Sequence, residues 1–186
     1  MLARNPGKSA PQVGLTVVAA HALDGAQVSK AVVGHDAVVS AYNPGWSEPK
    51  FHDLFLAGSA AIVQGVKQSS VKRLLVVGGA GSLFVAPALQ LVYTPAFSAA
   101  YKQGALAARE ALNLFKLENT LDWSFVLPPI SLAPGERTGK YRLGADDLLP
   151  GTGDQPAGIS VTDLAVAIVD EIETPRHVQR RFTVAH

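Results

Sequence analysis

Residues 73–81 read RLLVVGGAG, an apolar run that passes directly into a cluster of three glycines and one alanine. An uninterrupted leucine and valine run is typical of a strand buried on both faces of a parallel sheet. Glycines at the carboxyl end of such a strand let a ligand approach the backbone closely, because no Cβ intervenes. The residues leave a second interpretation open, a tight turn with close helix–sheet packing.

Further apolar runs lie on both sides of this stretch, and helical patterns separate them. The spacing predicts strands over 15–20, 36–41, 73–77, 123–127 and 181–184. It predicts helices from a cap at Asp24 to Gly34, from near Ser47 to Val66, over 98–117, and from a capping box at Ser160 to Pro175. The alternation predicts one α/β domain over 1–186 with a mostly parallel sheet. The glycine- and proline-rich segment 134–158 is expected to be loop, with a short hairpin around 141–143.

Composition excludes several classes of protein. The 186 residues are 48% hydrophobic and 17% charged, with a net charge of +1, which argues against a disordered chain and against a nucleic-acid-binding surface. The absence of cysteine excludes disulfides, thiolate zinc sites and cysteine nucleophiles. No window approaches the roughly 18 apolar residues of a membrane span, and the first residues carry no secretory apolar core. A cytoplasmic protein without a membrane partner is expected.

A scan for catalytic motifs excludes more than it finds. Ser82 lacks the flanking glycines of a nucleophile elbow, because Ala80 and Phe84 occupy those places. No histidine pair has metal-ligand spacing with a carboxylate partner, so no metal site is expected. The pair Asp146-Asp147 lies in a polar loop and is expected to be solvated, and Arg180-Arg181 is expected to face water.

Several segments, in order along the whole chain, carry a family resemblance. They are Ala3-Arg4-Asn5-Pro6, 36–42, 74–83, Leu121-Asp122-Trp123, Leu127-Pro128-Pro129 and 159–165. On these residues the chain resembles the NAD(P)H-binding atypical short-chain dehydrogenases, in particular the NADH-flavin reductase-like and NmrA-like group related to biliverdin reductase B. The resemblance implies a Rossmann-like, doubly wound sheet and a nicotinamide cofactor, NADP or NAD.

The resemblance also implies an incomplete sheet. Members of the family begin with a strand, a glycine-rich loop and a helix, whose N-terminus holds the cofactor pyrophosphate. The printed sequence opens at what resembles the end of the second strand, so an N-terminally truncated sheet is expected, incomplete beside 36–41. Unpaired strand edges invite association, and a homodimer or aggregate is therefore expected.

The resemblance assigns roles to particular residues. Arg4 would meet the 2′-phosphate of NADP, a contact that a basic residue after the second strand can make. The other cofactor-binding residues would be Ser40, Ala41, Tyr42, Gly78, Gly79, Ala80, Gly81, Pro128 and Pro129. Ser82, Leu83 and Tyr141 would contact the substrate, and the segment 134–158 would cover it.

The catalytic group stays unknown at this stage. Ordinary short-chain dehydrogenases use Tyr-x-x-x-Lys, but Tyr101 is followed by Ala105, and the other three tyrosines also lack the lysine. This pattern suits an NAD(P)H-dependent reductase of a flavin or quinone, whose acceptor takes its proton from solvent. Two alternatives stay open: a non-catalytic sensor of the NmrA kind, and an inactive fragment. Cofactor binding is expected to be impaired without the glycine-rich loop.

Overall fold

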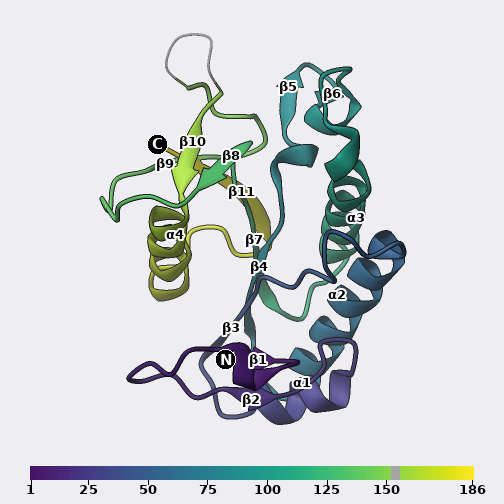
Figure 1. Cartoon of the computed structure of the whole chain (residues 1–186), viewed down its shortest axis with the longest axis vertical. Coiled ribbons are helices and arrows are strands. Elements are labelled where there is room, and N and C mark those ends of the chain that lie inside the picture. The colour runs from purple at the N-terminus through teal and green to yellow at the C-terminus, as the bar shows by residue number, and fades with distance from the viewer. Residues whose placement is uncertain (152–155) are drawn as a thin grey trace.

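The structure, a computed structural model, describes residues 1–151 and 156–186. Its elements are labelled in Figure 1. The strands are β1 (Leu2–Ala3), β2 (Val18–Ala19), β3 (Ala37–Ser40), β4 (Arg73–Val77), β5 (Phe84–Ala86), β6 (Leu89–Gln90), β7 (Asp122–Leu127), β8 (Ser131–Ala133), β9 (Arg142–Gly144), β10 (Gly158–Ser160) and β11 (Arg180–Ala185). The α-helices are α1 (Gly25–Val32), α2 (Phe51–Gln68), α3 (Ala99–Phe115) and α4 (Val161–Glu173), and short 3-10 turns cover Pro6–Lys8, Ala80–Ser82 and Leu91–Tyr93.

The central sheet has the strand order β3-β4-β7-β11-β9. β3, β4, β7 and β11 are parallel to one another, and β9 pairs antiparallel with β11 at the edge. The helices α2, α3 and α4 each connect two neighbouring parallel strands, as crossover connections require. The predicted α/β fold with a mostly parallel sheet is confirmed.

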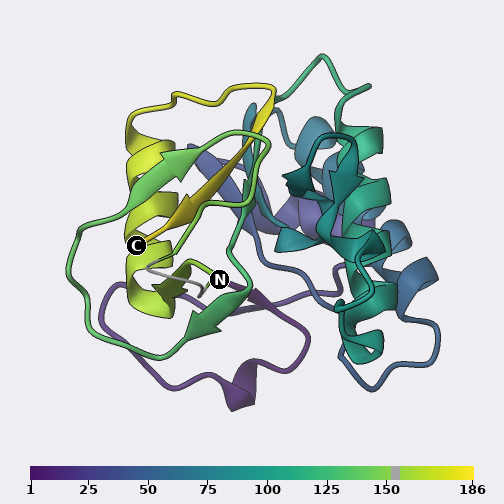
Figure 2. The same cartoon turned by 90° about the horizontal axis from the view of Figure 1, so that it is seen from above.

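Both faces of the sheet are buried, which explains the continuous apolar run of β4. Leu74 and Val76 lie in a core cluster that also contains side chains of α1, α2 and α3. Leu75 points to the opposite face and packs in a second cluster with Leu164 of α4. Figure 2 shows α4 on one side of the sheet and the other helices on the opposite side. The doubly wound arrangement follows from this division, because successive side chains of a strand point to opposite faces.

Local sequence signals set the ends of two helices. The Asp24 carboxylate accepts hydrogen bonds from the backbone N–H groups of Ala26 and Gln27, both at 3.0 Å, and α1 begins there. Gly34 follows the helix with φ +79°, a conformation that glycine adopts without strain. The Ser160 hydroxyl accepts from the Asp163 N–H at 3.0 Å and caps α4. Both predicted caps are confirmed.

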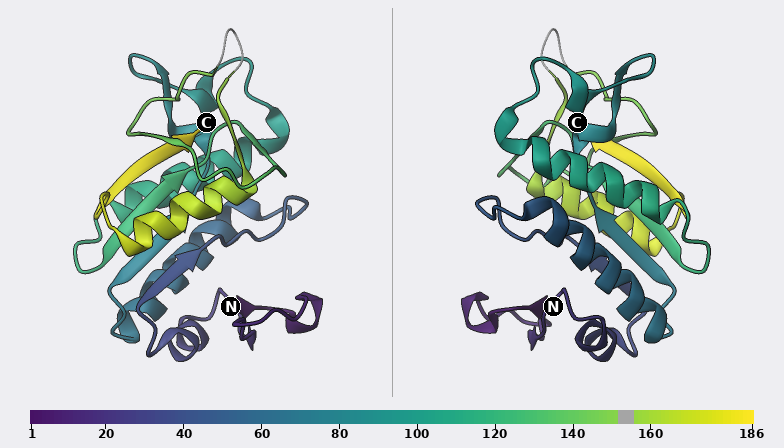
Figure 3. Two further views of the ribbon diagram at one scale, coloured as in Figure 1. Left: turned by 90° about the vertical axis from the view of Figure 1, so that its left-hand side faces the viewer. Right: turned by 90° about the vertical axis from the view of Figure 1, so that its right-hand side faces the viewer.

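The N-terminal strands lie apart from the central sheet. β1 and β2 form a separate parallel pair, seen at the bottom of both views in Figure 3. A cavity of about 860 Å³ separates this pair from β3, and its lining includes Leu2, Val28, Val38 and Ile62. Within the described residues, β1 pairs with β2 alone and β3 pairs with β4 alone. The opening beside β3 agrees with the incomplete sheet that the sequence predicts there.

Two local predictions are wrong. The run 15–20 is not a buried strand: only β2 is extended, and both of its residues are exposed, because it pairs with the short β1 outside the central sheet. The segment around 141–143 does not form a local hairpin. Its strand β9 pairs instead with β11, with Leu143 opposite Val184, because β11 offers it a free edge of the sheet.

Two other strand pairs lie outside the predicted elements. β5 and β6 form a short antiparallel pair, and β8 pairs in parallel with β10. Each has strands of only two or three residues, which give no usable periodicity.

Candidate functional site

A cleft of about 690 Å³ lies at the carboxyl ends of β3, β4 and β7. Ala41 and Tyr42 line it after β3, residues 78–81 after β4, and Pro128 and Pro129 after β7. The opposite wall comes from the start of α2, the segment 91–98 and the first half of α3. Parallel sheets bind ligands at this end of their strands, so the structure brings most of the predicted cofactor-binding residues into one suitable place.

The glycine segment is explained partly by packing. A Cβ on Gly78 would lie 2.2 Å from the Phe125 ring, and a Cβ on Gly81 would lie 2.7 Å from the Ala105 Cβ. Gly79 differs from both, since a Cβ there would meet no atom within 4 Å, although this residue also lines the cleft. The packing interpretation therefore holds for Gly78 and Gly81. Gly79 leaves open space beside the backbone, and the approach of a ligand there stays a prediction.

Tyr42 lines both the cleft and the cavity beside β3. Its hydroxyl donates to the Leu54 carbonyl at 3.1 Å, and a Cβ on Gly58 would lie 2.3 Å from its ring. Burial raises the pKa of the Tyr42 phenol, and the positive charge of the nearby Arg4 opposes that shift. Arg4 is exposed and lies in the lining of neither the cleft nor the cavity beside β3, and Ser40 lines that cavity rather than the cleft.

Tyr101 lies on α3 at the cleft, with its ring nearly perpendicular to that of Trp46, and it is more than half exposed. The residue one turn later, Ala105, packs against Gly81 at the contact described above. Ala105 also lines the cleft, so the position of the absent lysine lies at the cleft and holds a methyl group.

Ser82 and Leu83 are buried and lie beneath the cleft rather than in its lining. The Arg181 guanidinium donates to the Ser82 carbonyl at 3.0 Å and, through Nε, to the Asp146 carboxylate at 2.6 Å. The expectation that Arg181 faces water is wrong, since its side chain is 7% exposed. β11 points this residue at the loop after β4, so Arg181 holds that loop in place.

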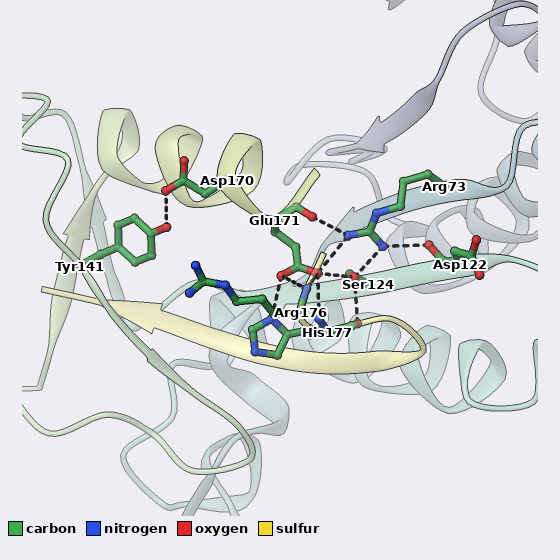
Figure 4. Close-up of polar contacts among 8 residues, drawn as sticks. All are labelled: Arg73, Asp122, Ser124, Tyr141, Asp170, Glu171, Arg176 and His177. Carbon is green, nitrogen blue, oxygen red and sulfur yellow. Dashed lines mark hydrogen bonds and ion pairs between the residues drawn. The ribbon is translucent and has the colours of Figure 1, made fainter. Parts of the chain in front are cut away.

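Tyr141 lies on the other side of the sheet, where its hydroxyl donates to the Asp170 carboxylate of α4 (Figure 4). Burial and this hydrogen bond raise the pKa of Tyr141 to about 12. The described residues of the segment 134–158 likewise lie outside the lining of the cleft. A substrate contact by Tyr141 and a covering role for the segment stay predictions.

A second polar cluster lies at the opposite, amino end of the sheet (Figure 4). The Arg73 guanidinium donates to the Glu171 carboxylate at 3.0 Å and to the Ser124 hydroxyl at 2.8 Å. Glu171 also lies 2.8 Å from His177 Nδ1, and it accepts from the backbone N–H groups of Arg176 and His177. Among the described residues, the Arg73 Nε atom alone is a buried polar side-chain atom without a partner. The cluster joins α4 to β4 and β7.

Burial opposes ionisation of Glu171, but the hydrogen bonds from His177, Ser124 and Arg176 outweigh it and lower the pKa of its carboxyl. Every oxygen of this carboxylate is bound within the protein, which identifies the cluster as structural. Within 1–151 and 156–186, no group of three or more histidine and acidic side chains is arranged to hold a metal ion.

Sequence reasoning missed the aromatic wall of the cleft. Trp46, Phe51 and Phe55 line it opposite the glycine segment, together with Gly104 of α3. A glycine in the interior of a predicted helix costs about 1 kcal/mol relative to alanine, so Gly104 was the available signal that a bulky group lies against α3.

Comparisons with known proteins agree on one family. The sequence profile of the NAD(P)H-binding family matches residues 1–175. The uncharacterized protein YwnB of Bacillus subtilis is 38% identical over 153 residues, which are 80% of this chain and 70% of YwnB.

Solved structures give the same result, each matching 100% of this chain. A Burkholderia pseudomallei protein, provisionally called an exported protein, has 41% identity and a TM-score of 0.87 over 85% of its length. A Bacteroides thetaiotaomicron protein, provisionally called an epimerase, has 38% identity and a TM-score of 0.90 over 83%. A Streptococcus pneumoniae protein, provisionally called an NADH-flavin reductase, has 28% identity and a TM-score of 0.83 over 85%.

The described part of the chain contains no helix that is long and apolar enough to cross a membrane. Because one relative is called an exported protein, the cytoplasmic location expected from the sequence stays a prediction.

Proposed function

The chain belongs to the NAD(P)H-binding family, and from that membership we propose that it is an NAD(P)H-dependent reductase of a small aromatic acceptor, a flavin or a quinone. The observation that carries the proposal is the cleft, which joins the carboxyl ends of three parallel strands. Its volume of about 690 Å³ lies within the range of about 300–1,000 Å³ for small-molecule sites. A relative provisionally called an NADH-flavin reductase, with 28% identity, supports the same reaction class.

The residues of the cleft fit the nicotinamide end of the cofactor. A bound NAD(P)H supplies a hydride, that is, two electrons and one proton. Gly79 leaves the backbone accessible on the cleft side, and the buried Pro128 and Pro129 form an apolar wall without N–H donors. These residues would position the nicotinamide ring and exclude water from one side of it.

The choice of acceptor follows from the lack of an acid in the cleft. Among its described lining residues, the titratable ones are Tyr42 and Tyr101, and neither has a lysine partner. An acceptor that needs an enzyme-supplied proton would react slowly here. Flavins and quinones take their second proton from water after the hydride arrives, so this cleft suits them.

The test measures whether the protein oxidises NADPH. The readout is the loss of absorbance of the reduced nicotinamide. Riboflavin 5′-phosphate and a naphthoquinone serve as acceptors, at high NADPH concentration. Acceleration by the protein supports a reductase. NADPH binding without oxidation would favour the second candidate, a sensor of the NmrA kind, which the missing Tyr-x-x-x-Lys pair also permits. Neither binding nor oxidation would favour an inactive fragment.

We propose that the 186-residue chain binds NADPH with a dissociation constant above the micromolar range. The cofactor pyrophosphate is held in this fold by N–H groups of a glycine-rich turn at a helix N-terminus, and the printed sequence contains no such motif. Arg4 favours NADP over NAD, yet an exposed ion pair contributes about 0–1 kcal/mol, against about 8 kcal/mol for micromolar binding.

Calorimetric titration with NADPH tests this affinity. Arg4→Ala is expected to change little. Fusing a relative's strand, glycine-rich loop and helix before Met1 is expected to give tight binding, because β3 has an unpaired edge among the described residues with which the added strand can pair. A low-micromolar dissociation constant for the 186-residue chain would contradict the proposal.

Association between copies is proposed at the open edge of β3. This strand pairs on one side only among the described residues, and Val39 is 49% exposed there. Open edges pair readily with other chains, and lysine on an edge opposes that pairing. Light scattering is expected to show dimers or larger species that Val39→Lys reduces; a parent protein that is monomeric throughout would contradict this.

A further inference from the structure

The wall of the cleft opposite the glycine segment is a ladder of aromatic rings. The Trp46 and Phe51 rings stack with centroids 5.3 Å apart and an interplanar angle of 21°. Phe51 and Phe55 continue the stack at 5.9 Å and 10°, and Tyr42 follows Phe55 at 6.1 Å. The ladder runs from the mouth of the cleft to the end of β3, and its outermost ring is the Trp46 indole.

Two helix glycines make room for this ladder. A Cβ on Gly104 of α3 would lie 2.9 Å from Trp46 Cζ3 and 3.2 Å from Phe51 Cε1. A Cβ on Gly58 of α2 would lie 2.3 Å from the Tyr42 ring. Glycine is a poor helix former. At these two positions it lets the rings lie against the helix backbone, where any side chain would exclude them.

Trp46 differs from the other rings of the ladder in its exposure. Phe51 and Phe55 are each 6% exposed, whereas Trp46 is 63% exposed. One face of the indole rests on Phe51, and the Tyr101 ring lies nearly perpendicular to the indole, with centroids 5.4 Å apart. These two contacts orient the indole, which lines the cleft and stays largely exposed.

Resting on the function proposed above, we propose that Trp46 is the stacking residue for the planar ring of the electron acceptor. A flat ring placed on the open part of the indole extends the existing stack and lies at the cleft, which Gly79 also lines with open space beside its backbone. Offset stacking favours flat aromatic rings over aliphatic carbonyl compounds. Trp46 therefore selects acceptors by shape, while the glycine side accommodates the nicotinamide.

The test uses riboflavin 5′-phosphate as the probe and its own fluorescence as the readout. The flavin is excited in its visible band, where tryptophan does not absorb, so quenching reports electron donation from an indole in contact with the ring. Binding to the parent protein is expected to quench the flavin. Trp46→Phe is expected to bind with similar affinity but without most of the quenching, because phenylalanine keeps the stack and is a poor electron donor.

Trp46→Leu is expected to weaken flavin binding by about 2- to 10-fold, the worth of one aromatic pair. The matched control is Trp123→Phe, which removes the chain's other tryptophan. Trp123 is 2% exposed in the core, so its replacement is expected to leave the quenching unchanged. Thermal unfolding of each variant checks that the fold is retained.

The outcomes separate this inference from the proposed reductase function. Quenching that survives Trp46→Phe, unchanged affinity in Trp46→Leu, or no flavin binding by the parent protein overturns the role of Trp46, whether or not NADPH is oxidised. Quenching that depends on Trp46, without NADPH oxidation, would support stacking of the flavin on Trp46 and would contradict the proposed reductase function.

Discussion

At their amino ends, β4 and β7 place Arg73 and Ser124 in a buried network with Glu171, whereas at their carboxyl ends the same two strands continue into glycines and prolines. The Arg73 and Glu171 side chains are 10% and 4% exposed, and they form an ion pair with each other. The carboxyl ends carry no ionic side chain into the cleft among the described lining residues.

The difference shows how one sheet supports two tasks. A buried ion pair that loses one partner leaves an uncompensated charge, so the amino end tolerates little change. The carboxyl end leaves backbone and apolar surface open, which a ligand can cover. Stability is therefore expected to respond strongly to substitutions at the amino end, and ligand binding to those at the carboxyl end.

The largest expected effect is that of Glu171→Ala. It leaves Arg73 buried without its carboxylate, and breaking a buried pair costs about 3–5 kcal/mol of unfolding free energy. Urea denaturation measures it. Glu173→Ala, at an exposed position of the same helix, is the matched control and is expected to stay within about 0.5 kcal/mol of the parent. Equal decreases in the free energy of unfolding of the two variants would show that the buried network contributes no more than an exposed helix position.

Gly78→Ala and Gly79→Ala separate the effects on stability and on ligand binding at the carboxyl end of β4. The new Cβ of the first overlaps the Phe125 ring, and such overpacking costs about 1–3 kcal/mol. The second adds its methyl to open space, so stability is retained while NADPH or flavin binding weakens. Denaturation and titration of both variants are the measurements. A Gly79→Ala protein with unchanged affinity would show that the ligand does not approach this residue.

A pH series examines the amino end with a smaller expected change. The folded-state pKa of Glu171 lies below its unfolded value, so its contribution to stability is present above the unfolded pKa. This contribution is lost as the pH falls through the folded pKa. Urea denaturation at several acidic pH values is expected to show a shallower decline for Glu171→Gln than for the parent. Parallel declines would mean that Glu171 does not titrate differently on folding.

The smallest expected effect is that of Tyr101→Phe on NAD(P)H oxidation. Ala105 stands where a lysine partner would be needed, so the phenol is not activated as an acid. Rates with a flavin acceptor are expected to stay within a few-fold of the parent. General acid catalysis contributes about 10²–10⁴-fold, and a loss of that size would identify Tyr101 as the proton donor.

Sequence reasoning succeeded where the signal was local. β4 has the predicted bounds, Arg73–Val77, and the caps at Asp24 and Ser160 begin their helices as expected. Burial on both faces and side-chain capping act within a few residues, so a single sequence records them. The three segments that end β3, β4 and β7 were likewise predictable as one site, because parallel strands bring their carboxyl ends together.

Long-range contacts escaped the same reasoning. Arg180 and Arg181 are adjacent and chemically alike, yet Arg181 is buried against Ser82, which lies 99 positions away along the chain. The stack of Trp46 on Phe51 depends equally on Gly104 in a different helix. The hydrophobic pattern of the neighbouring residues does not indicate either contact.

The sequence by itself determined the α/β class and the alternation of the four central parallel strands with helices, because these rest on hydrophobic periodicity that each segment carries alone. Its short motifs carried the resemblance to the family. Only the tertiary structure decided which arginine is buried, that Gly78 and Gly81 are closely packed whereas Gly79 is not, and that an aromatic ladder lines the same cleft as the glycine segment. The physical reason is that packing joins atoms distant in sequence, and whether a side chain fits depends on the backbone that it meets.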